Sequence, residues 1–362
     1  MASIEGEDVP MSLGPLMIDF AGLELTASDR ELLQHPRVGG VILFARNYAS
    51  RAQLSALTQA LHALRTPRLL IAVDHEGGRV QRFRTEFTEL PALRLLGGWY
   101  DRTAREALKL ATELGWLMAH ELRAADVDFS FAPILDLYDS HSRVINDRAF
   151  HPQPAAVGRL AQAYVRGMHA AGMAAVGKHF PGHGTVHADS HVELPVDHRD
   201  LPTVRNRDLV PFRLLAAAGL EGMMPAHILF PAVDAVPVGY SRVWLHDVLR
   251  QELQFNGAIF SDDLSMSGAA IAASPLERAE LALAAGCDMC LICNDRAAVM
   301  QVLDNLKPSP NPMAAVRLMR MHGRVVDGGA EYQKHPRRKL ALAALERLIA
   351  APSLALGDDT PA

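Results

Sequence analysis

The chain has 362 residues, a formal net charge of −5 and a pI near 6.3, so it carries no basic field for holding a nucleic-acid backbone. The N-terminus, MASIEGEDVP, lacks a basic stretch followed by an apolar region, and no apolar run approaches the roughly 18 residues that span a bilayer. We therefore expect a cytoplasmic protein that binds neither nucleic acid nor membrane.

Short apolar runs alternate with segments of helical periodicity from one end of the chain to the other. The runs predicted to be strands lie at 15–20, 39–45, 68–74, 128–136, 174–180, 222–228, 257–263 and 287–293. The segments predicted to be helices lie at 51–65, 101–124, 153–172, 203–219, 242–254, 275–285 and 295–304. In one of these helices, Ser274 is the expected N-cap, Pro275 takes the first position and Gly286 ends the helix.

Eight strands alternating with helices predict an α/β fold, a (β/α)8 barrel of the TIM type. The alternative fold is an open doubly wound sheet, which usually has five or six strands. No linker divides the chain, so we expect a single domain over 1–362 with a barrel core at about 11–305. We expect C-terminal helices at 309–351 on the outside and a frayed terminus at 352–362.

In such a barrel, the chemistry is found where the strands end at their C-terminal side. Polar residues fall at these predicted ends, namely Asp74, Lys178, His179, His227, Asp262 and Asp263. Because adjacent residues of a strand face opposite ways, at most one of the two neighbouring aspartates should point into the barrel mouth. The other is expected to support the structure or cap a turn.

Two connections are longer than the fold requires, which favours a functional role. One runs from Asp74 to the helix near 101, and the other spans 181–200. Histidines recur every four residues at 179, 183, 187 and 191, a spacing that on a helix would suggest zinc. Proline and glycine at 181, 182 and 184 interrupt any such helix, so we expect no metal site here.

Asp189 and His191 form the sharper pattern in the second connection. In an extended loop, residues two apart project to the same side, so the carboxylate can orient the imidazole and stabilise its protonated form. His191 is therefore a candidate acid/base. The alternative is a hydrogen bond that only stabilises the loop.

The other candidates remain ambiguous from residue type alone. Lys178 can be a Schiff-base lysine, a cation that binds substrate, or half of an internal ion pair. Arg82, Arg84 and Arg148 can grip hydroxyls, carboxylates or phosphates, or can simply be solvated. This mixture of charges at a barrel mouth suits a polar substrate such as a sugar.

All three cysteines, Cys287, Cys290 and Cys293, lie in the last predicted strand. Their spacing allows an iron–sulfur or zinc site, but alternation along a strand turns Cys290 away from the other two. We interpret them as small apolar core residues in a reducing compartment.

Several long motifs occur in an order that resembles glycoside hydrolase family 3, specifically its bacterial β-N-acetylglucosaminidase branch. The resemblance covers roughly residues 11 to 305. Lys178-His179-Phe180 and Ser261-Asp262 resemble patterns found across the family, and DHEGGRVQRF (74–83) and KHFPGHGTVHADSH (178–191) resemble the branch.

The resemblance implies a role for individual residues. Asp262 matches the catalytic nucleophile, and His191, supported by Asp189, matches an unusual acid/base. The positions that bind the terminal sugar are matched by Asp74, Arg82, Arg148, Lys178 and His179. Two successive displacements would retain the configuration of the sugar.

The resemblance also implies an exo-acting β-N-acetylhexosaminidase that removes N-acetylglucosamine from anhydro-muropeptides during cell-wall recycling. It would act as a monomer and need no cofactor. Many members of the branch have glutamine where this chain has His75, a difference that we expect to alter the pocket slightly. Many family members also append a second α/β domain, for which this chain has no room.

Four other functions remain open. A β-glucosidase and a glycoside phosphorylase keep the family but change the sugar or the acceptor. A lyase using Lys178 as a Schiff base changes the chemistry on the same barrel. A sensor that binds muropeptides without cleaving them would need neither Asp262 nor the pair of Asp189 and His191.

Overall fold

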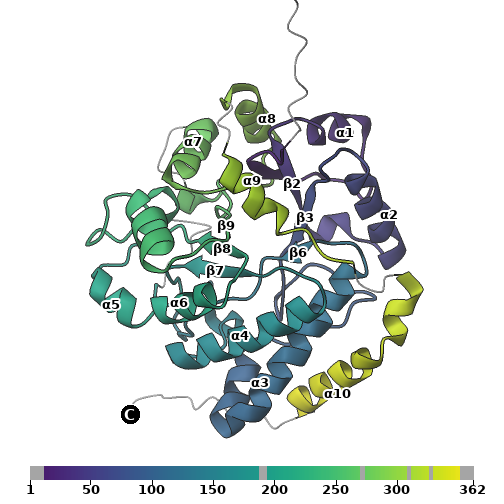
Figure 1. Ribbon diagram of the computed structural model, residues 1–362, viewed down its shortest axis with the longest axis vertical. Helices are drawn as coiled ribbons and strands as arrows, with labels where there is room; N and C mark the ends of the chain where they lie inside the picture. The colour runs from purple at the N-terminus through teal and green to yellow at the C-terminus, as the bar shows by residue number, and fades with distance from the viewer. Residues whose placement is uncertain (1–11, 187–193, 270–273, 308–310, 326–328, 351–362) are drawn as a thin grey trace, which may run out of the picture.

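The computed structural model describes residues 12–186, 194–269, 274–307, 311–325 and 329–350. Eight parallel strands occupy the centre, and helices surround them (Figure 1). The strands are β1 (Leu16–Ile18), β2 (Val38–Leu43), β3 (Leu70–Val73), β6 (Phe129–Ser130), β7 (Val176–Phe180), β8 (Gly222–Pro225), β9 (Ala258–Ile259) and β10 (Cys290–Ile292). Each overlaps one of the eight predicted runs, and only β2 begins outside its run, one residue before 39–45.

Main-chain contacts close these strands into a barrel. The strands form a five-stranded sheet, β10-β1-β2-β3-β6, and a three-stranded sheet, β7-β8-β9. Parallel bridges join the two sheets on both sides, from Ile134 to Lys178 and from Phe260 to Met289. The predicted (β/α)8 barrel is confirmed, and the open doubly wound sheet is wrong because neither end of the sheet stays free.

Aromatic side chains fill the barrel interior. The rings of Phe129, Phe131 and Phe260 are all fully buried, and their centroids lie 5.2 to 5.5 Å apart. Edge-to-face and tilted contacts at these separations are favourable for aromatic rings. The barrel interior is therefore packed with side chains and does not form a channel.

The outer layer follows the predicted pattern with local differences. Its helices are α1 (Ala27–Leu33), α2 (Arg51–His62), α3 (Arg94–Arg123), α4 (Pro154–Ala170), α5 (Leu201–Asn206), α6 (Leu209–Ala217), α7 (Pro275–Ala285), α8 (Arg296–Asn305), α9 (Pro312–Met319) and α10 (Pro336–Ala350). A π-helix, η4 (Val243–Glu252), takes the predicted segment 242–254. At α7, Ser274 accepts the N–H of Glu277 at 3.2 Å and Gly286 adopts φ 124°, which confirms the predicted ends.

The helix predicted at 203–219 is two helices, α5 and α6. Pro211 has no N–H, and its ring would clash with the carbonyl of Arg207 in a continuous helix. Arg207 accordingly has non-helical angles, φ −124° and ψ −76°. The break places Asp208 at the start of α6, where its side chain is buried.

Two other elements differ from the prediction. Helix α1 was not predicted, although Thr26 and Asp29 form a capping box at its start. Helix α3 begins at Arg94 instead of 101, and non-helical angles at Thr103 divide it into two parts.

The C-terminal segment lies along the outside of the barrel. Helix α10 runs beside α3 (Figure 1), and ion pairs join Arg337 to Glu113 at 3.0 Å and Arg347 to Glu106 at 2.9 Å. The predicted frayed terminus, 352–362, lies outside the described residues. Within the described part of the chain, no helix combines the length and apolar character needed to cross a membrane.

Two glycines of α3 provide a matched test of how closely it packs on α4. A Cβ at Gly115 would lie 2.1 Å from the carbonyl oxygen of Tyr164 on α4, whereas one at Gly98 would meet nothing within 4 Å. Alanine has the better helix propensity, so Gly98→Ala is expected to raise the free energy of unfolding by up to about 1 kcal/mol. Gly115→Ala is expected to lower it by about 1–3 kcal/mol through overpacking. Urea unfolding of both variants tests this, and equal effects would contradict the close contact.

Candidate active site

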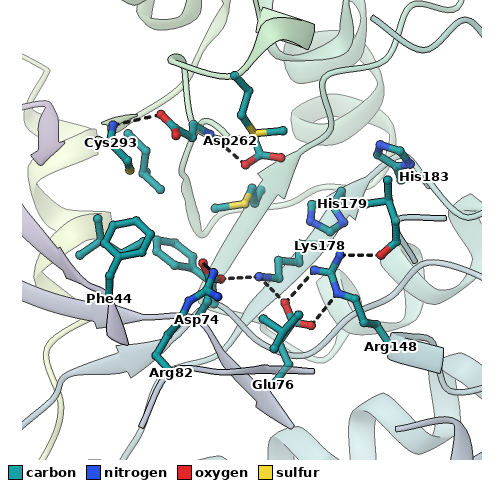
Figure 2. Close-up of a pocket in the computed structure, with 18 of the residues that line it drawn as sticks. Phe44, Asp74, Glu76, Arg82, Arg148, Lys178, His179, His183, Asp262 and Cys293 are labelled. Carbon is teal, nitrogen blue, oxygen red and sulfur yellow. Dashed lines mark hydrogen bonds and ion pairs between the residues drawn. The ribbon is translucent and has the colours of Figure 1, made fainter. Parts of the chain in front are cut away.

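A cavity of about 550 Å³ opens at the C-terminal ends of the strands (Figure 2). The residues that the resemblance matches to sugar binding and to the nucleophile all line it, namely Asp74, Arg82, Arg148, Lys178, His179 and Asp262. The predicted acid/base His191 and its partner Asp189 lie outside the described residues. The structure therefore brings the predicted sugar-binding groups and the predicted nucleophile into one cavity.

Lys178 lies at the centre of the polar cluster in this cavity. Its ammonium nitrogen is 2.7 Å from Asp74 Oδ1 and 2.7 Å from Glu76 Oε1, and its side chain is only 3% exposed. Burial alone would lower its pKa, but the two carboxylates outweigh this and raise the pKa above its ordinary value. A Schiff-base lysine must be neutral to attack a carbonyl, so the internal ion pair is the better interpretation.

Glu76 is the main site residue that the sequence analysis did not single out. Its two carboxylate oxygens accept Nε and Nη2 of Arg148 at 2.8 Å each, a bidentate pair. Burial alone would raise the pKa of Glu76, but Arg148 and Lys178 hold it well below its ordinary value. The only signal in the sequence was an acidic residue two positions after Asp74, in the long connection, because Glu76 lies beyond β3 in β4 (His75–Gly77).

Arg82 leaves part of its guanidinium accessible in the cavity. Its Nη2 is 3.5 Å from Asp74 Oδ2, its side chain is 32% exposed, and it lies over the ring of Phe44. Arg84, the neighbouring candidate, instead pairs with the exposed Glu89 at 3.0 Å and does not line the cavity. Of the two arginines, Arg82 is thus the one that lines the cavity.

His179 is oriented by a buried carboxylate that the sequence analysis also passed over. Asp136 Oδ2 accepts Nδ1–H of His179 at 2.7 Å, and Asp136 Oδ1 accepts the backbone N–H of His183 at 2.6 Å. Burial raises the pKa of Asp136, but the two histidines outweigh this and lower it. Asp136 ends the predicted strand 128–136, so its position was a signal of the same kind as Asp74.

Asp262 and Asp263 serve different purposes, although both border the cavity. Asp263 Oδ1 accepts the N–H groups of Ser265 and Cys293 at 3.0 Å each, so it ties the end of β9 to the end of β10. Burial and the neighbouring carboxylate raise the pKa of Asp263 to about 6. Asp262 lies across the cavity from Asp74 (Figure 2), and it accepts the Asp263 N–H at 2.8 Å.

The surroundings of Asp262 favour its ionised form. Burial alone would raise its pKa, but the neighbouring rings of His227 and His179 and the N–H of Asp263 outweigh this and lower the pKa below its ordinary value. His227 itself does not line the cavity. Its Nε2–H donates to the Asp263 carbonyl at 3.0 Å, and its ring stacks on Tyr240.

Comparison with known proteins identifies the scaffold that carries this cavity. The model of the family described as "Glycosyl hydrolase family 3 N terminal domain" matches residues 13–325. The chain belongs to glycosyl hydrolase family 3. It is similar to a protein named "Beta-hexosaminidase" from Nitrosospira multiformis, with 57% identity over 87% of this chain and 90% of that protein.

Solved structures of the family agree with this assignment. Native NagZ from Neisseria gonorrhoeae matches with a TM-score of 0.88 and 42% identity, over 93% of this chain and 98% of that one. The same protein in complex with N-trifluoroacetyl-D-glucosamine matches equally well over the same shares. The chain is thus a glycoside hydrolase with the barrel of family 3.

In this glycoside hydrolase, the first long connection contains a hairpin, β4 (His75–Gly77) paired with β5 (Val80–Gln81). Gly77 and Gly78 make its turn with φ of 108° and 56°, angles that other residues rarely adopt. A Cβ at Gly77 would also lie 2.6 Å from the carbonyl oxygen of Pro91. The tight turn presents Glu76 and Arg82 to the cavity.

His75, which was expected to alter the pocket slightly, does not line the cavity. Its ring packs between Phe83 and Phe87, with centroids 5.9 and 5.7 Å away, and it is 1% exposed. Burial, together with Arg84 and Arg82, lowers its pKa to about 3. The difference between histidine and glutamine at this position therefore falls in the packing against Phe83 and Phe87.

The cysteines whose spacing allowed a metal site are core residues in the fold. All three cysteines are buried and free, and only Cys293 borders the cavity. Among the residues outside the gap at 187–193 and the other undescribed segments, no group of three or more His, Cys, Asp or Glu side chains could hold a metal ion.

The buried pair of Glu76 predicts a pH dependence of stability. Glu76→Gln removes a charge that Arg148 and Lys178 need, so the free energy of unfolding at neutral pH is expected to fall by about 3 kcal/mol. Because the folded pKa of Glu76 is depressed, the wild-type advantage is complete above its ordinary value of 4.5 and shrinks as pH falls below it. Denaturant unfolding from pH 7 to pH 3 measures this. The exposed ion pair of Arg84 and Glu89 provides the control, since Glu89→Gln should change the free energy of unfolding by less than about 1 kcal/mol. An equal loss in both variants would contradict the account.

Proposed function

We propose that this family 3 enzyme is a retaining exo-β-N-acetylglucosaminidase that removes terminal β-linked N-acetylglucosamine. The observation that carries the proposal is that a single cavity holds the Asp262 carboxylate opposite a paired set of charged groups around Lys178. Charged donors and acceptors of this kind can satisfy the hydroxyls of one sugar ring. The anionic carboxylate is then placed to attack the anomeric carbon.

The relatives support the choice of sugar. The Nitrosospira multiformis protein is named as a beta-hexosaminidase, and the Neisseria gonorrhoeae NagZ structure was solved with N-trifluoroacetyl-D-glucosamine bound. Both likenesses span most of both chains. We extend the proposal to anhydro-muropeptides as substrates in cell-wall recycling, with a monomeric enzyme acting in the cytoplasm.

The first chemical step would form a glycosyl ester on Asp262. Its lowered pKa keeps it ionised near neutral pH, as a nucleophile requires. Asp74, Arg82, Arg148, Lys178 and His179 would hold the terminal sugar while the bond to the leaving oxygen breaks. Because the buried ion pairs hold these groups in place beforehand, little reorganisation is needed as charge develops.

His191 would supply and recover the proton. As the imidazolium it donates to the leaving oxygen, and as the neutral base it activates the water that cleaves the ester, with Asp189 orienting the ring. Two displacements at the same carbon retain its configuration. A neutral imidazole beside the 2-acetamido group and the ester also avoids a second anion there.

The first prediction concerns the nucleophile. Asp262→Asn should abolish release of p-nitrophenol from the β-N-acetylglucosaminide, because an amide cannot form the ester. Steady-state assays of the purified proteins, with Asp263→Asn as the adjacent control, measure this. Turnover by Asp262→Asn equal to the wild type would remove Asp262 from the mechanism.

The second prediction concerns the sugar and the acceptor. The wild type should strongly prefer the β-N-acetylglucosaminide to the β-glucoside, and free N-acetylglucosamine should form at the same rate with or without phosphate. Product analysis by chromatography measures both. A glycosyl phosphate product would favour the phosphorylase, and preference for the glucoside would favour the β-glucosidase.

The third prediction concerns the choice of histidine. His191→Glu should lose activity on unactivated substrates, by on the order of 10²–10⁴ if general acid catalysis is lost. Rates with an unactivated disaccharide substrate measure this. Full retention of activity would contradict the proposed advantage of a neutral group at this position.

A further inference from the structure

Arg199 contacts both ends of the connection that carries the predicted acid/base. Its Nη2 donates to Thr185 Oγ1 at 2.6 Å on the N-terminal side, and to Asp197 Oδ2 at 2.6 Å on the C-terminal side. Its Nη1 donates to Asp208 Oδ2 at 2.6 Å, at the start of α6. One guanidinium thus joins the side chains of Thr185, Asp197 and Asp208.

The two ends are also attached to different parts of the barrel rim. On the C-terminal side, Val196 bridges to Leu229 beyond β8, and the N–H of Asp197 donates to the Leu229 carbonyl at 2.9 Å. On the N-terminal side, Gly184 lies so close to Leu137 that a Cβ would be 1.9 Å from its carbonyl oxygen. Arg199 is a side-chain link between these two attachments.

The partners of Arg199 are buried, so the link is not an ordinary surface ion pair. The side chains of Asp197 and Asp208 are 5% and 1% exposed, whereas Arg199 is 23% exposed. A planar guanidinium presents five N–H donors in a fixed fork, so its Nη1 and Nη2 reach partners on two sides, whereas the donors of an ammonium all lie on one nitrogen. The arrangement needs arginine specifically.

We propose that Arg199 is a positioning residue for the acid/base, because it holds Thr185 and Asp197 together and so sets where the chain enters and leaves the connection that carries His191. The proposal rests on the proposed function of His191. Arg199 itself does not line the catalytic cavity. Its effect on the reaction passes through proton transfer to the leaving group and spares the nucleophilic step on Asp262.

This position in the mechanism has a kinetic signature. A dinitrophenyl leaving group departs without protonation, whereas a methoxyphenyl leaving group needs the acid. Loss of the link should therefore lower kcat/KM roughly ten- to a hundredfold for the methoxyphenyl β-N-acetylglucosaminide, as misplacement of a catalytic group does. The kcat/KM for the dinitrophenyl β-N-acetylglucosaminide should stay within about threefold of the wild-type value. A general loss of folded protein would lower both rates equally.

The variants are chosen so that a folding defect is not mistaken for the effect. Arg199→Lys keeps the positive charge but loses the two-nitrogen guanidinium. Thr185→Val removes the hydrogen bond between Thr185 and Arg199 without leaving a buried charge unpaired. Arg250→Ala is the matched control, because Arg250 pairs with the buried Asp288 at 2.8 Å, at the start of β10 and away from the mouth. It should lower thermal stability without any dependence on the leaving group.

A double-variant cycle with His191→Ala completes the experiment. If the inference holds, Thr185→Val as a single variant shows the leaving-group dependence, and the double variant with His191→Ala shows no more dependence than His191→Ala by itself. If His191→Ala shows the dependence while Thr185→Val and Arg199→Lys behave like Arg250→Ala, the role of Arg199 is wrong and that of His191 stands. If His191→Ala itself shows no dependence, the proposed acid/base and this inference both fail.

Discussion

The site depends on the ion pairs that the buried ammonium of Lys178 makes with Asp74 and Glu76. The ammonium reaches from β7, in the three-stranded sheet, to Asp74 and Glu76 beyond β3 of the five-stranded sheet, so it joins the two sheets at the barrel mouth. A lysine buried to this extent is tolerable only when carboxylates compensate its charge. Glu76 in turn needs Arg148, and the cluster therefore positions its own members before any sugar binds.

In the proposed function, this pairing is the reason that charged groups would recognise a neutral sugar. Lys178, Glu76 and Arg148 are already paired with opposite charges, so a sugar hydroxyl would meet oriented donors and acceptors at low reorganisation cost. Asp262 lies across the cavity, in surroundings that keep it ionised. In the proposed mechanism, binding and nucleophilic attack would occur on opposite walls, and proton transfer would come from the connection whose ends Arg199 joins.

The alternation of strands and helices was sufficient to predict the barrel and the strand ends at which Asp74, Lys178 and Asp262 lie. Glu76 could not be placed in the same way, because the hairpin that presents it depends on the turn at Gly77 and Gly78 and not on strand periodicity. The division at Arg207 escaped prediction because apolar periodicity continues through Pro211. Partners such as Asp136 with His179 depend on tertiary contacts between residues 43 positions apart.

The central claim is a covalent intermediate on Asp262, and trapping it is the most direct test. In His191→Ala, the dinitrophenyl β-N-acetylglucosaminide should still load the enzyme while hydrolysis of the ester is slow. Mass spectrometry of the quenched protein should then find one N-acetylhexosamine added, with peptide mapping placing it on Asp262. An adduct on another residue, or turnover with inverted configuration and no adduct, would contradict the account.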